Sequence, residues 1–313
     1  MNSEAKKVEM PLRSTVDSPA EGHAQNKKMK KMLKKISALI LVWMCVACVS
    51  VNDENIALKG YNWSNPKEIK LPEILKEISG ICFIPGMETD LLAIQDEDGI
   101  LFKINTKTGQ IQQTSFGKAG DYEDISVLDS LIFVLRSDGA IFAFDVDSIG
   151  KPELSAKYLW EKVLPKAEYE GLYADSETKT IYALPKEDKG ERKSGVKNIY
   201  ALKFSDGNLQ LTETKSLSIS DIAAKSGKKN LNFKPSAITK NNKNTNWYIL
   251  SSTNNCLVEY SSKWELLNVY KLPKKQFLQP EGIVFDSKGN LYISSEGDAL
   301  KSGYILSFDY LGE

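Results

Sequence analysis

The sequence predicts an all-β fold, a β-propeller of five blades over residues 56–313, behind a lipoprotein signal segment. A short motif recurs that combines an acid, a small residue and an aliphatic β-forming residue, and one copy of it is weaker. The small or central position of its copies falls at Gly80, Asp124, Gly171, Ala237 and Gly282. A repeat of about 45 residues with several short strands is typical of propeller blades. Helical periodicity is almost absent from the same region, which supports the prediction.

Each copy of the motif is followed by two further predicted strands. The second strands are predicted at 91–94, 131–134, 181–184, 247–250 and 291–294. The third strands are predicted at 100–104, 140–144, 199–202, 256–260 and 304–308. The dipeptides Asp98-Gly99 and Asp138-Gly139 are typical of the tight hairpins that join such strands.

The interval between Gly171 and Ala237 is longer than the others. It contains a charged loop at 186–197 and a segment at 218–232 that we expect to form a short helix, capped by Ser220-Asp221, or an irregular excursion. Without these insertions the interval fits one blade, so five blades are predicted. A six-bladed ring would need a degenerate blade hidden there. Residues 67–71 are expected to close the ring as the outer strand of the last blade, which removes an exposed sheet edge.

Residues 29–47 have the features of a secretory signal peptide. Basic residues precede an apolar run from Ile36 to Ala47. This run is shorter than the roughly 20 residues that span a bilayer as a helix. The segment 45–48 resembles a bacterial lipobox, in which cleavage leaves a cysteine that becomes lipidated, here Cys48. An uncleaved N-terminal anchor helix is the alternative.

The segments on either side of the signal peptide are predicted to lack structure. Residues 48–55 are short and polar, as expected of a linker behind a lipid anchor. Val49 follows Cys48 in place of the Asp associated with inner-membrane retention, which favours the outer membrane and leaves the inner membrane open. Residues 1–28 are charged and are expected to be disordered, or an over-extended start with Met29 or Met32 as the initiator.

Composition excludes several classes of site. The chain has 41 basic and 41 acidic residues, and many positives precede the apolar run, so the propeller is mildly acidic and nucleic acid is not an expected partner. The single histidine, His23, lies before the predicted cleavage site. The mature chain would therefore have no Ser-His-Asp triad and no histidine metal ligand. Catalysis, if present, would depend on carboxylates, Lys, Tyr or a carboxylate-bound metal.

Carboxylates at the repeat starts form the candidate site. The innermost strand of each blade lines the channel, so we expect four glutamates to converge near the axis: Glu77, Glu123, Glu170 and Glu281. Further acids are expected close by or at the same mouth: Asp121, Asp124, Asp96, Glu97 and Glu296. Unpaired carboxylates raise one another's pKa, and calcium, which takes six to eight oxygen ligands, would relieve the repulsion. Alternatively, these acids accept backbone hydrogen bonds or pair with basic residues.

Other residues are expected to be structural. Cys82 and Cys256 lie in predicted strands of different blades and are expected to be buried free thiols, although export would permit a disulfide. The aromatic residues before the motif are expected to fill gaps between blades, with sugar stacking as the alternative: Tyr122, Tyr169 and Phe233. The charged stretch 186–193 is expected to be a solvated loop.

The repeat starts also resemble a known family. The run 71–81, followed by Gln95-Asp96-Glu97 and 121–125, is similar to the SdiA-regulated (YjiK-type) family of bacterial propeller proteins. The resemblance covers residues 70–313 and implies a cell-envelope protein capable of binding calcium, without DNA binding. The chain departs from the pattern at Pro235-Ser236-Ala237, where the fourth repeat lacks its acid. Any cation is therefore expected off the axis, away from the fourth repeat.

Together these features favour a monomeric, lipid-anchored binding module. Its acid mouth, ordered by calcium, would bind a small molecule or a partner in the envelope. A calcium-dependent hydrolase of phosphoesters, lactones or esters is the alternative, because a bound metal ion can activate water at such a mouth. A scaffold with a filled channel is a third possibility.

Overall fold

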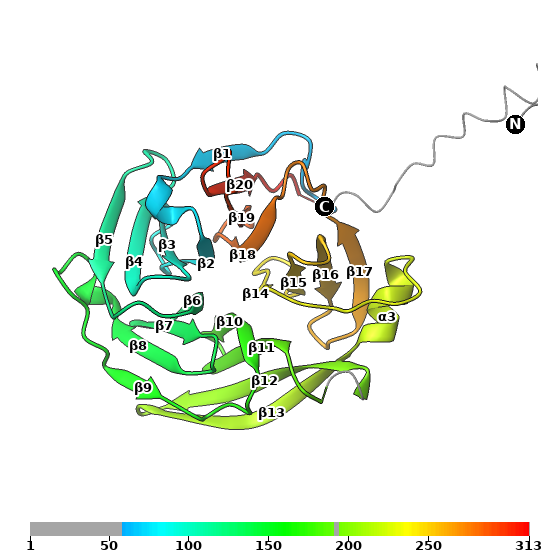
Figure 1. The fold of residues 1–313 in the computed structure, drawn as a ribbon, viewed down its shortest axis with the longest axis horizontal. Coiled ribbons are helices and arrows are strands. Elements are labelled where there is room, and N and C mark those ends of the chain that lie inside the picture. The colour runs from blue at the N-terminus through cyan, green and yellow to red at the C-terminus, as the bar shows by residue number, and fades with distance from the viewer. Residues whose placement is uncertain (1–57, 191–193, 313) are drawn as a thin grey trace, which may run out of the picture. The chain divides into compact units, whose positions relative to one another are not determined.

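The fold is a five-bladed β-propeller. The computed structural model describes residues 58–190 and 194–312. Within them, twenty strands form five antiparallel four-stranded sheets around a common axis (Figure 1). The predicted all-β propeller is confirmed, and the six-bladed alternative is wrong. The predicted signal peptide, lipidation site Cys48, linker and N-terminal extension lie outside the described residues. No helix within the described ranges is both long and apolar enough to span a bilayer.

The strands run outward from the axis in each blade, from the innermost to the outermost. Blade 1 contains β2 (Ile78–Phe83), β3 (Asp90–Gln95), β4 (Ile100–Asn105) and β5 (Ile111–Ser115). Blade 2 contains β6 (Tyr122–Leu128), β7 (Leu131–Arg136), β8 (Ile141–Asp145) and β9 (Tyr158–Trp160). Blade 3 contains β10 (Glu168–Asp175), β11 (Thr180–Glu187), β12 (Val196–Ser205) and β13 (Asn208–Ser218). Blade 4 contains β14 (Ala237–Lys240), β15 (Trp247–Ser251), β16 (Cys256–Tyr260) and β17 (Leu266–Lys271).

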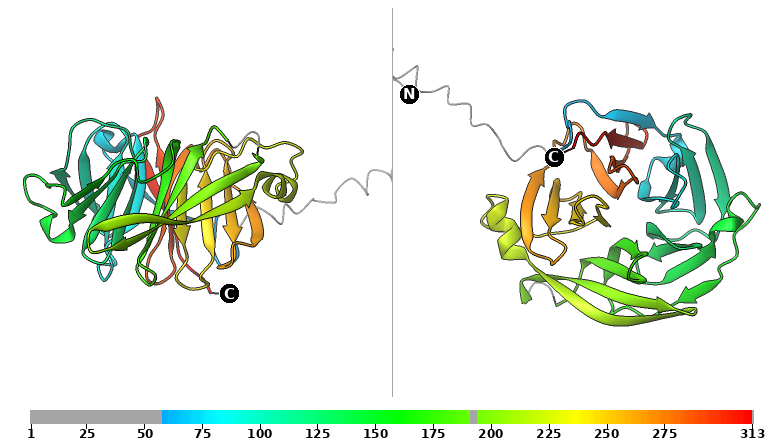
Figure 2. Two further views of the ribbon diagram at one scale, coloured as in Figure 1. Left: turned by 90° about the horizontal axis from the view of Figure 1, so that it is seen from below. Right: turned by 180° about the vertical axis from the view of Figure 1, so that it is seen from behind.

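Blade 5 is completed by the N-terminal strand. It contains β18 (Gln279–Phe285), β19 (Leu291–Glu296) and β20 (Tyr304–Phe308), and β1 (Lys67–Lys70) pairs with β20 as the fourth strand. The two ends of the propeller therefore lie side by side in one sheet (Figures 1 and 2). A hydrogen bond of 2.6 Å from the Tyr61 hydroxyl to the Gly289 carbonyl adds to this closure. The predicted closing strand is confirmed.

The small residues of the motif lie where neighbouring inner strands approach closely. A Cβ atom on Gly80 would lie 2.5 Å from the Asp124 Cα atom. A Cβ atom on Gly282 would lie 2.6 Å from the Ser79 carbonyl oxygen. A side chain does not fit at either distance. Glycine is therefore required at these two positions because the inner strands are crowded near the axis.

Side chains of one blade satisfy the free backbone edge of the next. The Leu172 N–H donates to Asp124 Oδ2 over 2.7 Å, and the Ala174 N–H donates to Ser126 Oγ over 2.9 Å. The Ser294 hydroxyl donates to the Ser79 carbonyl over 2.9 Å. Inner strands have no fifth strand to pair with, so these bonds replace the missing ladder and join the blades.

The long third interval is explained by longer outer strands and a helix. β12 and β13 have 10 and 11 residues, and the helix α3 (Ile219–Lys225) follows them. The predicted helix is confirmed, but its N-cap is Ser218, whose hydroxyl accepts a hydrogen bond from the Asp221 N–H. The described residues also include two short 3₁₀ helices, Glu73–Leu75 and Val146–Ser148.

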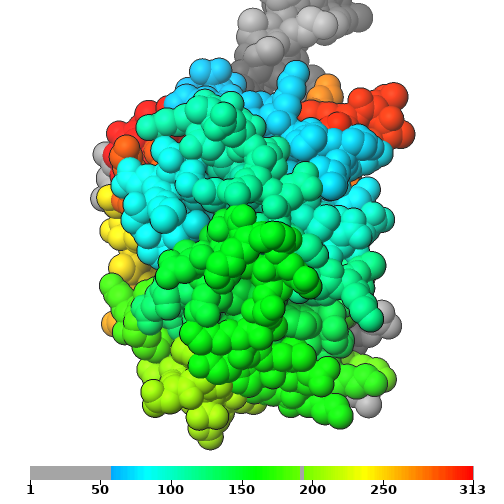
Figure 3. All heavy atoms as spheres, turned by 90° about the vertical axis from the view of Figure 1, so that its left-hand side faces the viewer, coloured from blue at the N-terminus to red at the C-terminus, as the bar shows by residue number. Residues whose placement is uncertain are grey.

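Two further structural predictions are confirmed. Three aromatic side chains are buried between blades, as expected: Tyr122, Tyr169 and Phe233. Cys82 and Cys256 are buried free thiols. Side chains also close the outer side of blades 1 and 2 into a continuous surface (Figure 3).

Candidate functional site

β-Bulges at the starts of the inner strands direct carboxylates into the channel mouth. In β6, β10 and β18 the pairing register shifts across one residue, which leaves Glu123, Glu170 and Glu281 out of the ladder. A bulge re-aims the extra residue away from the sheet face. The same position relative to the small residue is occupied by Ser79 in blade 1 and Ser236 in blade 4. The five equivalent positions, one from each blade, therefore form a ring of three glutamates and two serines.

Glu77, which was expected to join that ring, lies two residues before Ser79 and belongs to a different cluster. The carboxylate oxygens of Glu77, Asp96 and Glu296 lie within 4.8 Å of one another. Glu77 precedes β2, Asp96 follows β3, and Glu296 ends β19. Blades 1 and 5 thus supply all three side chains.

Backbone hydrogen bonds between these blades hold the cluster together. The Asp96 N–H donates to the Glu77 carbonyl over 3.4 Å within blade 1. The Gly297 N–H donates to the Lys76 carbonyl over 2.9 Å and so connects the end of β19 to the start of blade 1. The three carboxylates therefore project from neighbouring, connected backbone segments.

The cluster is electrostatically unfavourable without a cation. Burial, together with the charge of Glu77, raises the pKa of Asp96 to about 6. Burial, with the charge of Glu281 next in importance, raises the pKa of Glu296 to about 8. The Asp96 Oδ1 atom is buried and has no hydrogen-bond partner among the described residues. Buried polar atoms normally have a partner, so this oxygen is available as a ligand.

The donor set fits calcium. Two oxygens bound to one calcium at about 2.3–2.6 Å lie at most about 5 Å apart, and the cluster meets that limit. With one oxygen from each residue, the three carboxylates supply three of the six to eight oxygens that calcium takes, so water or a ligand would complete the shell.

The opposite side of the mouth carries an ion pair. Lys186 Nζ lies 2.6 Å from Glu170 Oε1 and 3.7 Å from Glu168 Oε1. Burial raises the pKa of Glu170 and also that of Glu123, where the charge of Glu170 adds to the effect. Burial, and then the charge of Glu170, raises the pKa of Glu281 to about 7.

Lys186 is the residue that sequence reasoning missed. The prediction of a solvated loop is wrong for Lys186 and Glu187, which belong to β11. The position of Lys186 near the end of the second strand of its blade could have identified it from the sequence. Lys186 lies two residues after the partner of Gly171, as Glu296 lies two residues after the partner of Gly282. An alignment on the second strands would have placed Lys186 at the mouth.

The other predicted acids lie outside the cluster. Asp124 is buried, and its carboxylate accepts hydrogen bonds from the Ile125 and Leu172 N–H groups over 2.8 and 2.7 Å, although burial raises its pKa. Asp121 is exposed and accepts a hydrogen bond from the Ser137 hydroxyl. Glu97 is exposed in the β3–β4 loop. Asp124 thus accepts backbone hydrogen bonds, which was the alternative to cation binding predicted for these acids.

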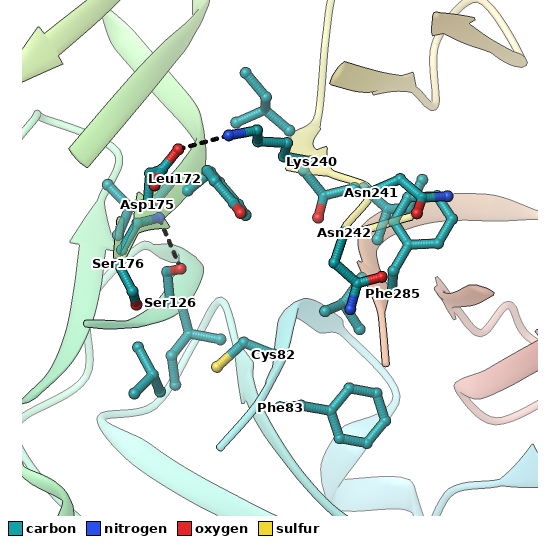
Figure 4. A pocket seen from close by; sticks show the side chains of 18 of the residues that line it. Cys82, Phe83, Ser126, Leu172, Asp175, Ser176, Lys240, Asn241, Asn242 and Phe285 are labelled. Carbon is teal, nitrogen blue, oxygen red and sulfur yellow. Dashed lines mark hydrogen bonds and ion pairs between the residues drawn. The ribbon is translucent and has the colours of Figure 1, made fainter. Parts of the chain in front are cut away.

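The C-terminal halves of the inner strands enclose a separate cavity of about 290 Å³ (Figure 4). Its wall includes an ion pair of 2.9 Å between Lys240 and Asp175, and Ser126 Oγ, which accepts the Ala174 N–H. Both the charges and these hydrogen-bonding groups have partners within the wall. The acid mouth, where Asp96 Oδ1 has no partner among the described residues, is therefore the better candidate for a functional site.

Comparison with known proteins agrees with the fold. A family model described as SdiA-regulated matches residues 53–300. Among solved structures, glutaminyl cyclase from Myxococcus xanthus is 12% identical, with a TM-score of 0.54, and the match covers 79% of this chain and 96% of that one. Regucalcin from Agrobacterium tumefaciens, described as a calcium-binding protein, is 10% identical, with a TM-score of 0.50 and coverage of 74% and 89%. At these identities the likeness shows the fold alone. No curated protein matches the chain.

Proposed function

The chain belongs to the SdiA-regulated family, and we propose that it is a lipid-anchored protein of the cell envelope whose acid mouth binds one divalent cation, calcium. The observation that carries the proposal is the Glu77–Asp96–Glu296 cluster with its buried, unpartnered Asp96 oxygen. A cation between these carboxylates would offset both their mutual repulsion and the cost of burying them.

A bound cation would also give the mouth a binding function. The carboxylates fill only part of a calcium coordination shell, so open positions would face the channel mouth. An oxygen-bearing small molecule, or a carboxylate or carbonyl of an envelope partner, could replace water at these positions. The proposed role is therefore a calcium-ordered binding module.

Calcium titration of the full-length chain by calorimetry and thermal unfolding tests the proposal. Wild type is expected to bind calcium and to gain about 2.7 kcal/mol of unfolding free energy at a calcium concentration 100 times Kd. Asp96→Asn is expected to weaken binding by about tenfold or more, since a unit charge is lost from the site. Glu97→Gln is the matched control, because Glu97 is exposed and its charge acts on Asp96 less than that of Glu77, so binding should change much less. No stabilisation of wild type in excess calcium would reject the cation site.

The membrane anchor is a separate part of the proposal. The lipobox-like segment 45–48 supports lipidation at Cys48 and, with Val49 after it, the outer membrane over the inner membrane. Cys48→Ser is expected to move the protein from the membrane fraction to the soluble fraction and to abolish incorporation of labelled fatty acid. Unchanged fractionation and labelling would reject the lipoprotein assignment.

A calcium-dependent hydrolase is the second candidate. The observation in its favour is Glu281, whose raised pKa of about 7 suits a general base near neutral pH. Phosphoesters, lactones and esters would be assayed with calcium, using wild type and Glu281→Gln. Turnover that falls at least about 100-fold in the variant would support the enzyme. Absence of turnover in all three classes would leave the binding module as the function.

A further inference from the structure

Lys186 places a positive charge among the carboxylates of the mouth. Its Nζ atom contacts Glu170 Oε1 at 2.6 Å and Glu168 Oε1 at 3.7 Å. The Glu170 side chain is only 7% exposed, and that of Lys186 is 32% exposed. An ammonium group at this depth lies within the mouth, and the ion pair is only partly screened by water.

The position of Lys186 in the repeat is informative. At the end of its second strand, blade 1 places Asp96 and blade 5 places Glu296, and both belong to the candidate cation site. Blade 3 places Lys186 at the corresponding position. One structural position therefore supplies a cation ligand on one side of the mouth and a fixed positive charge on the other.

The backbone of Lys186 is held in place from behind. Lys197, which is 1% exposed, donates from Nζ to the Lys186 carbonyl over 2.7 Å. β11 also pairs with β10 on both sides of Lys186, through Pro185↔Tyr169 and Glu187↔Glu168. The ammonium group is thus tethered at a defined place.

We propose that Lys186 is a built-in counter-ion that takes the place of a second divalent cation beside Glu170 and Glu168, so that the mouth binds one cation, between blades 1 and 5. This inference rests on the proposed cation site. The distance from Nζ to Glu170 Oε1, 2.6 Å, is also the upper end of a calcium–oxygen distance.

Electrostatics across the mouth agree with this role. Lys186 lowers the pKa of Glu281 and that of Glu123, against the larger opposing effect of their burial. Its charge therefore reaches carboxylates on blades 2, 3 and 5. A tethered charge does not dissociate, so it offsets one carboxylate charge in this half of the mouth whatever the calcium concentration.

The number of calcium ions bound per full-length chain, measured by equilibrium dialysis, tests the inference. Wild type is expected to bind about one ion, and Lys186→Met, which removes the charge at similar length, about two. Lys186→Met with Glu170→Gln should return to about one, because the second site loses a carboxylate. Lys240→Met is the matched control, since Lys240 pairs with buried Asp175 in the other cavity; it should bind about one ion.

The possible outcomes separate this inference from the proposed function. One ion bound by both wild type and Lys186→Met would overturn the counter-ion role and leave the cation site intact. No ion bound by either would overturn both. No ion bound by wild type and one by Lys186→Met would reject the blade 1–blade 5 site and support the counter-ion.

Glu170→Gln provides a second measurement in case Lys186→Met does not fold. This variant leaves Lys186 charged but without its principal partner. Calcium affinity at the Glu77–Asp96–Glu296 cluster should then fall severalfold through repulsion, since uncompensated charges act across the mouth. An unchanged affinity would mean that the ion pair is merely structural.

Discussion

Asp96 and Glu296 hold their protons at higher pH than free carboxyl groups do, because the fold buries them close to other acids. Their pKa values are raised from 3.8 to about 6 and from 4.5 to about 8. A cation would reverse this effect, since it favours the charged forms. Calcium binding near neutral pH should therefore release protons and weaken as the pH falls.

The stability of the calcium-free protein should depend on pH with a defined sign. Between about pH 4.5 and pH 8 the folded state binds more protons than the unfolded state, because the pKa of Glu296 is raised on folding, as are those of Asp96 and Glu281. Stability should consequently rise as the pH falls from 8.5 to 5.5. The described residues contain no histidine, so no side chain with an ordinary pKa in this range obscures the effect.

Thermal unfolding in a chelator at pH 5.5 and 8.5 measures this dependence. The unfolding temperature of wild type should be several degrees higher at pH 5.5, and excess calcium should remove most of the difference. The Asp96→Asn, Glu296→Gln double variant is the control, with a smaller difference. An unfolding temperature that is equal at both values or lower at pH 5.5 would contradict the assigned shifts.

For individual residues, the sequence predicted that acids form the candidate site but not which of these acids lie together. Glu123 and Asp124 are adjacent acids in the same strand, yet one enters the mouth and the other caps Leu172. The difference depends on a bulge, and residue type alone does not locate a bulge. Lys186 was missed because a lysine in a charged stretch has the composition of a loop.

The inner strand is the element on which the mouth depends. Its small residue allows neighbouring blades to meet, and the bulge beside it points the acid inward. Gly282→Ala should destabilise the protein by about 1–3 kcal/mol through overpacking, because the new Cβ would lie 2.6 Å from the Ser79 carbonyl oxygen. Chemical denaturation measures the change. Gly190→Ala, where the nearest atom is 3.7 Å away, is the control and should be nearly neutral.

Blade 4 contains a buried carboxylate that needs no cation. Glu259 accepts hydrogen bonds from the hydroxyl groups of Tyr248 and Tyr270 over 2.8 and 2.6 Å, and from the side-chain amides of Asn246 and Asn268 over 2.9 Å each. Although burial opposes it, this donor cage lowers the pKa of Glu259. Glu259, away from the mouth, thus has four donors, whereas Asp96 Oδ1 at the mouth has no partner among the described residues.

Glu259→Gln should therefore be destabilising. The amide group would face donors that require an acceptor, which costs about 1–3 kcal/mol for an unsatisfied buried group. Chemical denaturation at pH 7 measures the loss, and calcium affinity should stay at the wild-type value because Glu259 lies in blade 4. A neutral substitution would show that the cage does not stabilise the fold. The lowered pKa places any acid loss of this contribution below about pH 4.5.

The sequence predicted which elements exist better than their lengths. The second and third strands of blade 3 were expected at 181–184 and 199–202, whereas β11 has 8 residues and β12 has 10. β11 extends to Glu187 because it pairs with the start of β10, through Tyr169↔Pro185 and Glu168↔Glu187, and this extension carries Lys186 into the strand. Strand length here depends on tertiary pairing, which local propensity does not record.

At the scale of the whole molecule, the repeat predicted the ring because each blade is built from a continuous segment. The closing strand β1 was also visible, since residues 67–71 precede the first repeat. The site was harder to predict because Glu77 and Glu296 become neighbours only when the ring closes. Which acids meet depends on the number of blades and on the register at closure, and neither can be read from one repeat.

A crystal structure of the protein grown with calcium, with anomalous diffraction recorded, tests the central claim most directly. The account predicts one anomalous peak within about 2.3–2.6 Å of oxygens from Glu77, Asp96 and Glu296, with the Lys186 ammonium group still beside Glu170. Two results would contradict it. One is a crystal grown in saturating calcium that shows no anomalous peak between these carboxylates. The other is a peak beside Glu170 in place of the Lys186 side chain.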